Sequence, residues 1–306
     1  MARTRRRRCS RRWGWTSTTQ RSGRRGSTRS ARWSIGPRPL RRSWRARPET
    51  GRAVALFDAH AHLAAPEFAD DLPEVLARAQ SVGLCGIVTV GETLADAERI
   101  LDLADRHPLI RPAAGLYPTI LDREAVEAVV AFARGHADRL VALGEVGLDR
   151  WAVKTEAEWR VQEAILTRFV ALSDELDLPL NIHSRSAGRH AIALLKRCGA
   201  RWVLLHAFDG KASTAGEGVA AGYYFSIPPS VVRSPQKQKL VRQLPLERLL
   251  LETDSPVLGP DPTIRNEPAN IHVACRAVAE LKGVSPDDVR QVTTDNARRL
   301  FPRAFA

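Results

Sequence analysis

The sequence contains few cysteines, and those in its main part are widely scattered. Cys85, Cys198 and Cys275 show no paired spacing, so we expect buried free thiols in a reducing compartment. The sequence also lacks an Asn-x-Ser/Thr acceptor, and no apolar run approaches the length of a membrane-spanning helix. These absences argue against an extracellular protein and favour a cytoplasmic enzyme or binding protein with no membrane partner.

Acidic residues are almost absent from the first 52 residues, and lysine is absent from them altogether. This segment holds 18 Arg against one acid, Glu49, which is a formal charge of +17. Because the whole chain carries +13, the remaining 254 residues carry −4. The high pI, which would otherwise suggest nucleic acid, therefore belongs to the start of the chain and not to its body.

Residues 1–52 also show no hydrophobic period, and they hold four of the seven Trp residues. Such a composition cannot bury a core, so we expect a disordered Arg-rich extension. Three interpretations compete: an arm that binds phosphate backbones, a transit peptide, and GC-rich upstream DNA translated from a start codon placed too early. We favour the third and place the folded domain at 53–306. A nuclear or organellar location would follow only from a genuine signal.

From residue 54 onward, short apolar runs alternate with longer amphipathic segments. Strands that alternate with helices indicate a parallel sheet, and eight such units over about 250 residues indicate an α/β fold of the (β/α)8 TIM-barrel type. The first turn, "DAHAHLAAP", lacks the glycines of a nucleotide-binding open sheet. The eight runs are 54–58, 86–90, 110–115, 140–147, 178–183, 201–207, 222–227 and 248–254.

Polar side chains gather where five of these runs end. In a TIM barrel the carboxyl ends of the strands meet at the functional face. Buried imidazoles and carboxylates are costly unless they are hydrogen-bonded or bind a metal, so the pattern predicts a metal site. The residues are Asp58, His60 and His62 at run one, Glu145 and Asp149 at run four, His183 at run five, His206 at run six, and Glu252, Asp254 and Ser255 at run eight.

Four imidazoles and two carboxylates are enough ligands for two divalent ions (Mg, Mn or Zn), with imidazole favouring Zn or Mn. A closely spaced ion pair needs a shared oxygen, and Glu145 lies between the other ligands in strand order. We expect His60, His62, Glu145 and Asp254 around one ion, and Glu145, His183 and His206 around the other. Asp58 and Asp149 are expected to orient histidines from behind.

Such a site is suited to hydrolysis by an activated water, with Asp254 able to accept the proton and Glu145 as the other catalytic carboxylate. Three arginines that follow strands, Arg185, Arg189 and Arg265, suit an anionic substrate, and a phosphodiester is the obvious candidate. Because the body is acidic, we expect single-stranded DNA or chain ends as the substrate. The cations of "RSPQKQK" (233–239) are expected on a solvated helix face.

At these motifs the chain resembles the TatD family of metal-dependent deoxyribonucleases, within the amidohydrolase-like barrels. The motifs are "FDAHAHL", "GEVGLD", "LNIHSRSAGR", "LLHAFDG", "LLLETDSP", "RNEPAN" and "TTDNARRLFP", in family order over about 54–302. Their details are most similar to the subgroup of TatD DNase domain-containing protein 3. The resemblance implies a divalent-metal DNase whose ligands are the six residues grouped above. In one departure, "GLYP" places Tyr117 where the family usually has a histidine.

Two other functions remain open. Another barrel hydrolase could act on a small amide, lactone or phosphoester, although such enzymes often bridge their metals with a strand-four lysine, and Lys154 lies past that strand. Alternatively, a non-catalytic protein could bind nucleic acid through the Arg-rich arm, with salt-sensitive affinity. No pattern in the sequence predicts an oligomeric state.

Overall fold

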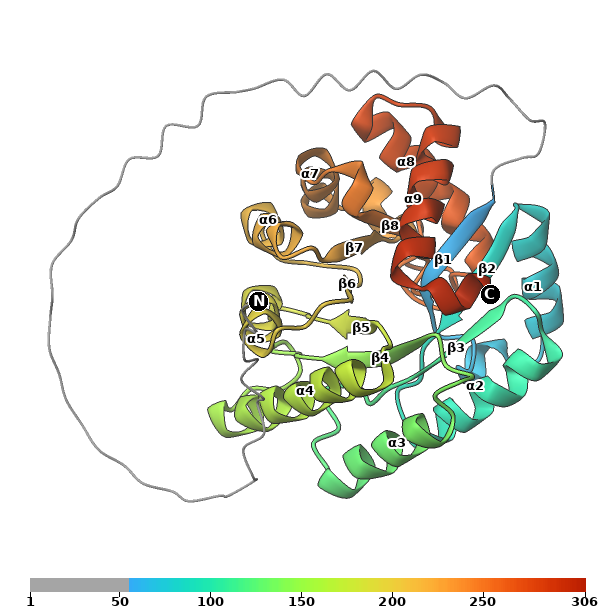
Figure 1. Ribbon diagram of the computed structural model, residues 1–306. Helices are drawn as coiled ribbons and strands as arrows, with labels where there is room; N and C mark the ends of the chain where they lie inside the picture. Colours follow the sequence, from blue (N-terminus) through green and yellow to red (C-terminus); the bar gives the residue numbers. More distant parts are fainter. Residues whose placement is uncertain (1–54) are drawn as a thin grey trace, which may run out of the picture. The chain divides into compact units, whose positions relative to one another are not determined.

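The computed structural model describes residues 55–306, which form an eight-stranded parallel barrel (Figure 1). Neighbouring strands follow the chain order from β1 to β8, so the predicted TIM barrel is confirmed. The prediction of disorder at 1–52 lies outside the described residues. The strands are β1 (Leu56–Ala61), β2 (Leu84–Thr89), β3 (Ile110–Ala114), β4 (Ala142–Gly147), β5 (Leu180–His183), β6 (Val203–Leu205), β7 (Tyr224–Ile227) and β8 (Leu249–Leu251).

The helices lie around the outside of the strands (Figure 1). In α2, Ala97, Ile100, Leu101 and Leu103 are buried at helical spacing. None of the helices in the described part of the chain is both long and apolar enough to span a membrane. The helices are α1 (Leu72–Ser81), α2 (Leu94–Arg106), α3 (Arg123–Gly135), α4 (Glu156–Leu176), α5 (Gly188–Cys198), α6 (Ala212–Ala220), α7 (Pro235–Gln243), α8 (Ile271–Lys282) and α9 (Pro286–Leu300).

Hydrogen bonds just beyond β8 tie the last strand to the first. The amide of Asp254 donates to the carbonyl of His60 at 2.9 Å, and the amide of His62 donates to the carbonyl of Ser255 at 2.8 Å. The polar residues after β1 and β8 are therefore held against each other by the backbone. Each strand overlaps one of the eight apolar runs, which explains why their polar ends converge.

The three cysteines are unpaired, as expected, but only one is fully buried. Cys275 lies in the core, whereas Cys85 and Cys198 are half-buried. Cys198 ends α5, where the helix meets its turn at the surface, and this explains why the expectation of burial was wrong there.

Candidate metal centre

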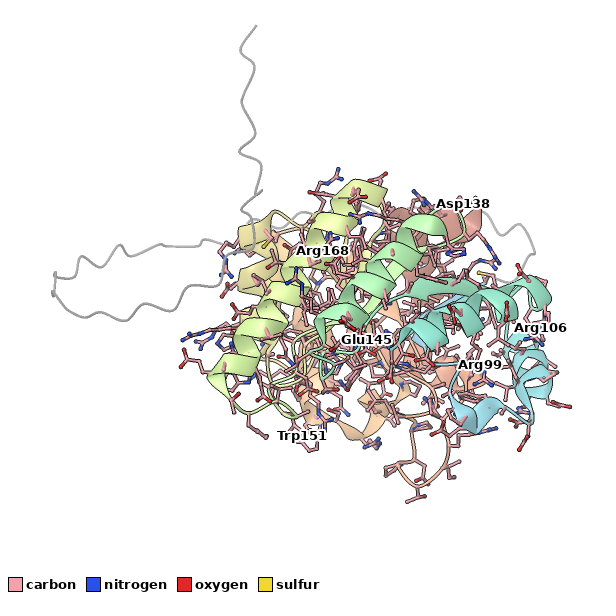
Figure 2. The ribbon with its side chains drawn as sticks, turned by 90° about the horizontal axis from the view of Figure 1, so that it is seen from below. Arg99, Arg106, Asp138, Glu145, Trp151 and Arg168 are labelled. Carbon is pink, nitrogen blue, oxygen red and sulfur yellow. The ribbon has the colours of Figure 1, made fainter. Side chains whose placement is uncertain are left out.

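Glu145 lies at the carboxyl-terminal end of the barrel, and its two carboxylate oxygens face different histidines. Oε1 lies 2.6 Å from Nδ1 of His183 and 2.8 Å from Nε2 of His206. Oε2 lies 3.4 Å from Nε2 of His62 and 3.8 Å from Nε2 of His60. Glu145 is buried, and Figure 2 shows it inside the molecule. This carboxylate therefore offers one oxygen to each of two pairs of imidazoles.

Asp254 completes the group that His60 and His62 begin. Its Oδ1 lies 3.4 Å from Nε2 of His60 and 3.3 Å from Nε2 of His62, and these two nitrogens lie 3.1 Å apart. Asp254 has a φ of 52°, a left-handed backbone that is uncommon outside glycine and concentrates at functional sites. This turn directs the chain after β8 toward the histidines of β1.

Ligand-type atoms cluster closely enough to hold metal ions. One cluster is His60, His62 and Glu145, and another is Glu145, His183 and His206; within each, the ligand atoms all lie within 4.8 Å of one another. A third cluster joins His60 and His206 to the buried Glu252. Imidazole nitrogens with shared carboxylate oxygens suit a transition metal or zinc, so the residues present fit divalent ions.

The other ring nitrogens of three of these imidazoles meet polar groups, two of them buried and the third, Glu92, in the wall of a cavity that opens onto these residues. Nδ1 of His60 lies 2.9 Å from Oδ1 of Asn181, and Nε2 of His183 lies 3.1 Å from Oδ2 of Asp149. Nδ1 of His62 lies 3.6 Å from a carboxylate oxygen of Glu92. Contacts of this kind fix the ring orientation of metal-binding histidines. Asp149 therefore lies beside a histidine, as predicted. The sequence analysis missed Asn181, although it is the one amide side chain in the apolar run "LPLNIH" and could have been noticed for that reason.

Asp58 does not take the role expected of it. Its carboxylate accepts hydrogen bonds from the backbone of His60 at 3.2 Å, the backbone of Thr253 at 2.9 Å and the hydroxyl of Thr253 at 2.6 Å. Among the described residues, Asn181 and not Asp58 supports the His60 ring. Burial raises the pKa of Asp58 to about 7. Asp58 thus joins β1 to the segment after β8.

The carboxylates and imidazoles shift each other's pKa values. Burial by itself would lower the pKa of His60, but its hydrogen bond to Asp254 and the charge of Glu145 raise that pKa to about 10. For His183 the same competition, won by Glu145 and Asp149, raises the pKa to about 9. Burial and the nearby charge of His60 lower the pKa of His206 to about 4.

The two carboxylates at the centre respond in the opposite direction. Burial alone would raise the pKa of Glu145, but His206 and His183 hold it well below its usual value. For Asp254, hydrogen bonds from His60 and His62 outweigh burial and lower the pKa. Both carboxylates are therefore ionised at neutral pH, as metal ligands must be.

A cavity of about 730 Å³ opens onto these residues, and a few other polar side chains line it. Arg185 is in its wall, as expected. Within residues 55–306, Arg189 and Arg265 lie outside the wall, and the guanidinium of Arg265 donates to both oxygens of Asp71, at 2.8 and 2.6 Å. The sequence could not show that Arg265 is held by a residue from α1's amino-terminal end, far away along the chain.

Lys237 corrects another expectation. Its side chain is buried at the cavity instead of lying on a solvated helix face, and its Nζ donates to the carbonyl of Ala207 at 2.8 Å. Arg233 and Lys239 are exposed, as predicted for this segment. The difference arises because Lys237 shares the inward face of α7 with Leu240 and Val241.

Tyr117, the departure from the family motif, also lines the cavity. Its ring meets the His183 ring edge-on, with centroids 5.2 Å apart. Burial and the charges of Glu145 and Asp149 raise the pKa of its phenol, so the hydroxyl stays protonated. A neutral donor thus stands beside a predicted metal ligand.

Comparison with known proteins assigns the family. The family model described as "TatD related DNase" matches residues 57–302. The chain is 46% identical to Deoxyribonuclease TATDN3 of Homo sapiens, over 82% of this chain and 96% of that protein. It is 33% identical to Uncharacterized metal-dependent hydrolase YabD of Bacillus subtilis, over 80% and 98%.

Solved structures agree with this assignment. The crystal structure of YJJV, a TatD homologue from Escherichia coli, superposes with a TM-score of 0.76 at 26% identity, covering 82% of this chain and 99% of that one. The family and subgroup that the motifs resemble are therefore confirmed. The chain belongs to the TatD family of deoxyribonucleases and is a hydrolase of that family.

Proposed function

We propose that this chain is a deoxyribonuclease that hydrolyses phosphodiester bonds with two divalent ions. The observation that carries the proposal is the division of Glu145, whose Oε1 faces His183 and His206 and whose Oε2 faces His60 and His62. Two ligand sets that share one carboxylate match a two-metal site. The ligand set would be the six residues predicted from the strand ends, and Mg, Mn and Zn remain the candidate ions.

Divalent ions held there would lower the pKa of water and offset negative charge on a phosphate. The ionised Asp254 lines the cavity and is positioned to accept a proton from the attacking water. Arg185 and Lys237, which both line the cavity, can donate to the phosphate oxygens, since Nζ of Lys237 has further donors besides the one bonded to Ala207. The protonated Tyr117 can donate a third hydrogen bond.

The contacts of Lys154 argue against the alternative of an amide or lactone hydrolase with a lysine bridge. Its Nζ lies 5.8 Å from the ring of Trp151, on the exposed loop after β4, whereas Glu145 is the group whose two oxygens face both pairs of histidines. We therefore favour DNA, as single strands or chain ends. The cytoplasmic location stays a prediction from the scattered thiols.

The test uses the full chain, stripped of metal and then supplied with Mg2+, Mn2+ or Zn2+, with end-labelled single-stranded DNA. We expect metal-dependent cleavage that Asp254→Asn abolishes. Asp261→Asn is the matched control, because Asp261 is exposed and, within residues 55–306, its side chain bonds only to Thr263 in its own turn. If the folded, metal-loaded chain leaves DNA intact, the proposal is wrong and a small phosphoester or amide becomes the better candidate.

A further inference from the structure

An exposed indole lies in the loop that leads away from the metal centre. Trp151, in the turn between β4 and α4, is 55% exposed, and Figure 2 shows it at the rim of the molecule while Glu145 lies inside. The guanidinium of Arg185 stacks on the Trp151 ring, with Cζ 3.6 Å from the centroid. Because Arg185 also lines the cavity, the indole adjoins the mouth of the candidate active site.

The Trp151 loop is held in place by a carboxylate that also contacts a predicted metal ligand. Oδ1 of Asp149 accepts hydrogen bonds from the backbone of Trp151 at 2.8 Å and of Ala152 at 2.7 Å. Oδ2 of the same carboxylate lies 3.1 Å from Nε2 of His183. The backbone that carries the indole is therefore set relative to the metal centre before any ligand arrives, which reduces the entropy lost on binding.

Trp151 differs from the other two indoles that the structure describes. Trp159 is half-buried, and its Nε1 donates to the carbonyl of Val153 at 2.9 Å, so it supports the loop from inside. Trp202 is 43% exposed but precedes β6, at the amino-terminal end of the barrel. Of these three, Trp151 alone combines an exposed ring with a place at the carboxyl-terminal end, where the cavity opens.

Two cations lie against this indole although the body of the chain is acidic. Besides Arg185, Nζ of Lys154 lies 5.8 Å from the centre of the Trp151 ring, whereas the neighbouring Arg150 stacks on Trp159 and pairs with Glu163. A large aromatic ring among cations, beside a phosphate-binding cavity, is the combination with which proteins bind single-stranded nucleic acid. Base stacking requires only a free base face and tolerates any sequence.

We propose that Trp151 and Arg185 form a stacking platform for one nucleobase of the substrate strand, next to the phosphate bound at the metal centre. This inference rests on the proposed nuclease function. The ring surface left open by Arg185 receives the base, and the guanidinium lies between that base and the phosphate. A base inside a duplex already stacks on its neighbours, so the platform selects single strands and frayed ends.

The first test compares the full-length chain on two substrates: a 12-nucleotide deoxythymidine strand and a strand of the same length in which stable abasic (tetrahydrofuran) residues replace the thymidines, so that it has the phosphodiesters but no aromatic base. Loss of one base–indole stack should lower the ratio of the two kcat/KM values about tenfold in Trp151→Ala. Trp151→Phe should recover most of the ratio, and Trp202→Ala should leave it unchanged. An unchanged ratio in Trp151→Ala overturns the proposal. If kcat/KM nevertheless falls equally on both substrates, Trp151 acts only by supporting Asp149 and His183.

A second test does not depend on cleavage. The metal-free full-length chain is irradiated with a single strand that contains 5-iododeoxyuridine, and the crosslinked peptides are identified by mass spectrometry. We expect a crosslink at Trp151 that duplex DNA of the same sequence does not give, and none at Trp202. Absence of the Trp151 crosslink refutes the platform even if the enzyme cleaves DNA. A crosslink without cleavage of either substrate would keep the platform and refute the proposed nuclease.

Discussion

Replacement of Asn181 by alanine should weaken metal binding from a position that touches no metal. Oδ1 of Asn181 lies 2.9 Å from Nδ1 of His60, and its Nδ2 donates to the carbonyl of Ala59 at 2.9 Å. All three residues are fully buried, so water cannot replace the lost amide. Asn181→Ala therefore frees the His60 ring to rotate and also leaves a carbonyl unpaired.

The size of the effect follows from these two contacts. Loss of a contact behind a metal ligand costs about 10–100-fold in metal affinity. A buried polar group without a partner costs about 1–3 kcal/mol, so two such groups should lower the unfolding free energy of the metal-free protein by about 2–6 kcal/mol. Asn181→Asp keeps an acceptor for His60 and loses only the donor to Ala59. It should therefore bind metal more tightly than the alanine variant while remaining less stable than the wild type.

Metal affinity is measured by competition with a chromophoric chelator, and stability by urea unfolding in EDTA. Asn181→Ala should bind metal at least tenfold more weakly than the wild type, with Asn181→Asp in between. If the alanine variant binds metal with wild-type affinity, or if both variants bind equally weakly, Asn181 does not orient His60 and the reasoning fails.

Three further predictions concern the same centre. Glu145→Gln should reduce the number of metal ions bound per chain, measured by elemental analysis. It should also lower activity by more than the roughly 10–100-fold expected when a residue only supports a metal ligand. Full metal occupancy would contradict a bridging role for Glu145. Gly115→Ala places a Cβ 2.3 Å from the backbone of the Gly144–Glu145 peptide, so this variant should displace Glu145 and abolish metal binding. The control Gly216→Ala adds a Cβ at a helical position with open space around it, and it should stabilise the fold by about 0.5–1 kcal/mol. The raised pKa values of about 10 for His60 and about 9 for His183 keep both imidazoles protonated at pH 7. Metal binding should therefore release protons and weaken as the pH falls. Titration calorimetry in buffers of different ionisation enthalpy should give binding heats that depend on the buffer, and buffer-independent heats would refute this prediction.

Two of the arginines predicted to bind substrate differ in the structure: Arg185 lines the cavity, whereas Arg265 is bound to Asp71 outside it. Arg185→Ala should raise KM for a DNA strand, because Arg185 lines the cavity. Arg265→Ala should leave KM unchanged, because that guanidinium is paired with Asp71. Steady-state kinetics on one oligonucleotide checks both variants, and equal effects on KM would restore Arg265 to the substrate site.

The alternation of apolar runs predicted the barrel because strand and helix periods are local properties of a sequence. The same alternation predicted that His60, Glu145 and His183 meet, since parallel strands bring their carboxyl ends to one face. Asp58 was misassigned for a related reason. The alternation of a strand shows which side chains point to the same face. It does not show that the carboxylate of Asp58 meets Thr253 instead of an imidazole.

The sequence by itself therefore determined the fold class, the family and the identity of the converging polar residues, because these depend on period, residue type and order. Only the tertiary structure decided which oxygen of Glu145 faces which imidazole, that Asn181 lies behind His60 although 121 residues separate them, and that Lys237 turns inward while Arg265 pairs with Asp71. These contacts depend on how segments far apart along the chain pack against each other, and no local pattern records that packing.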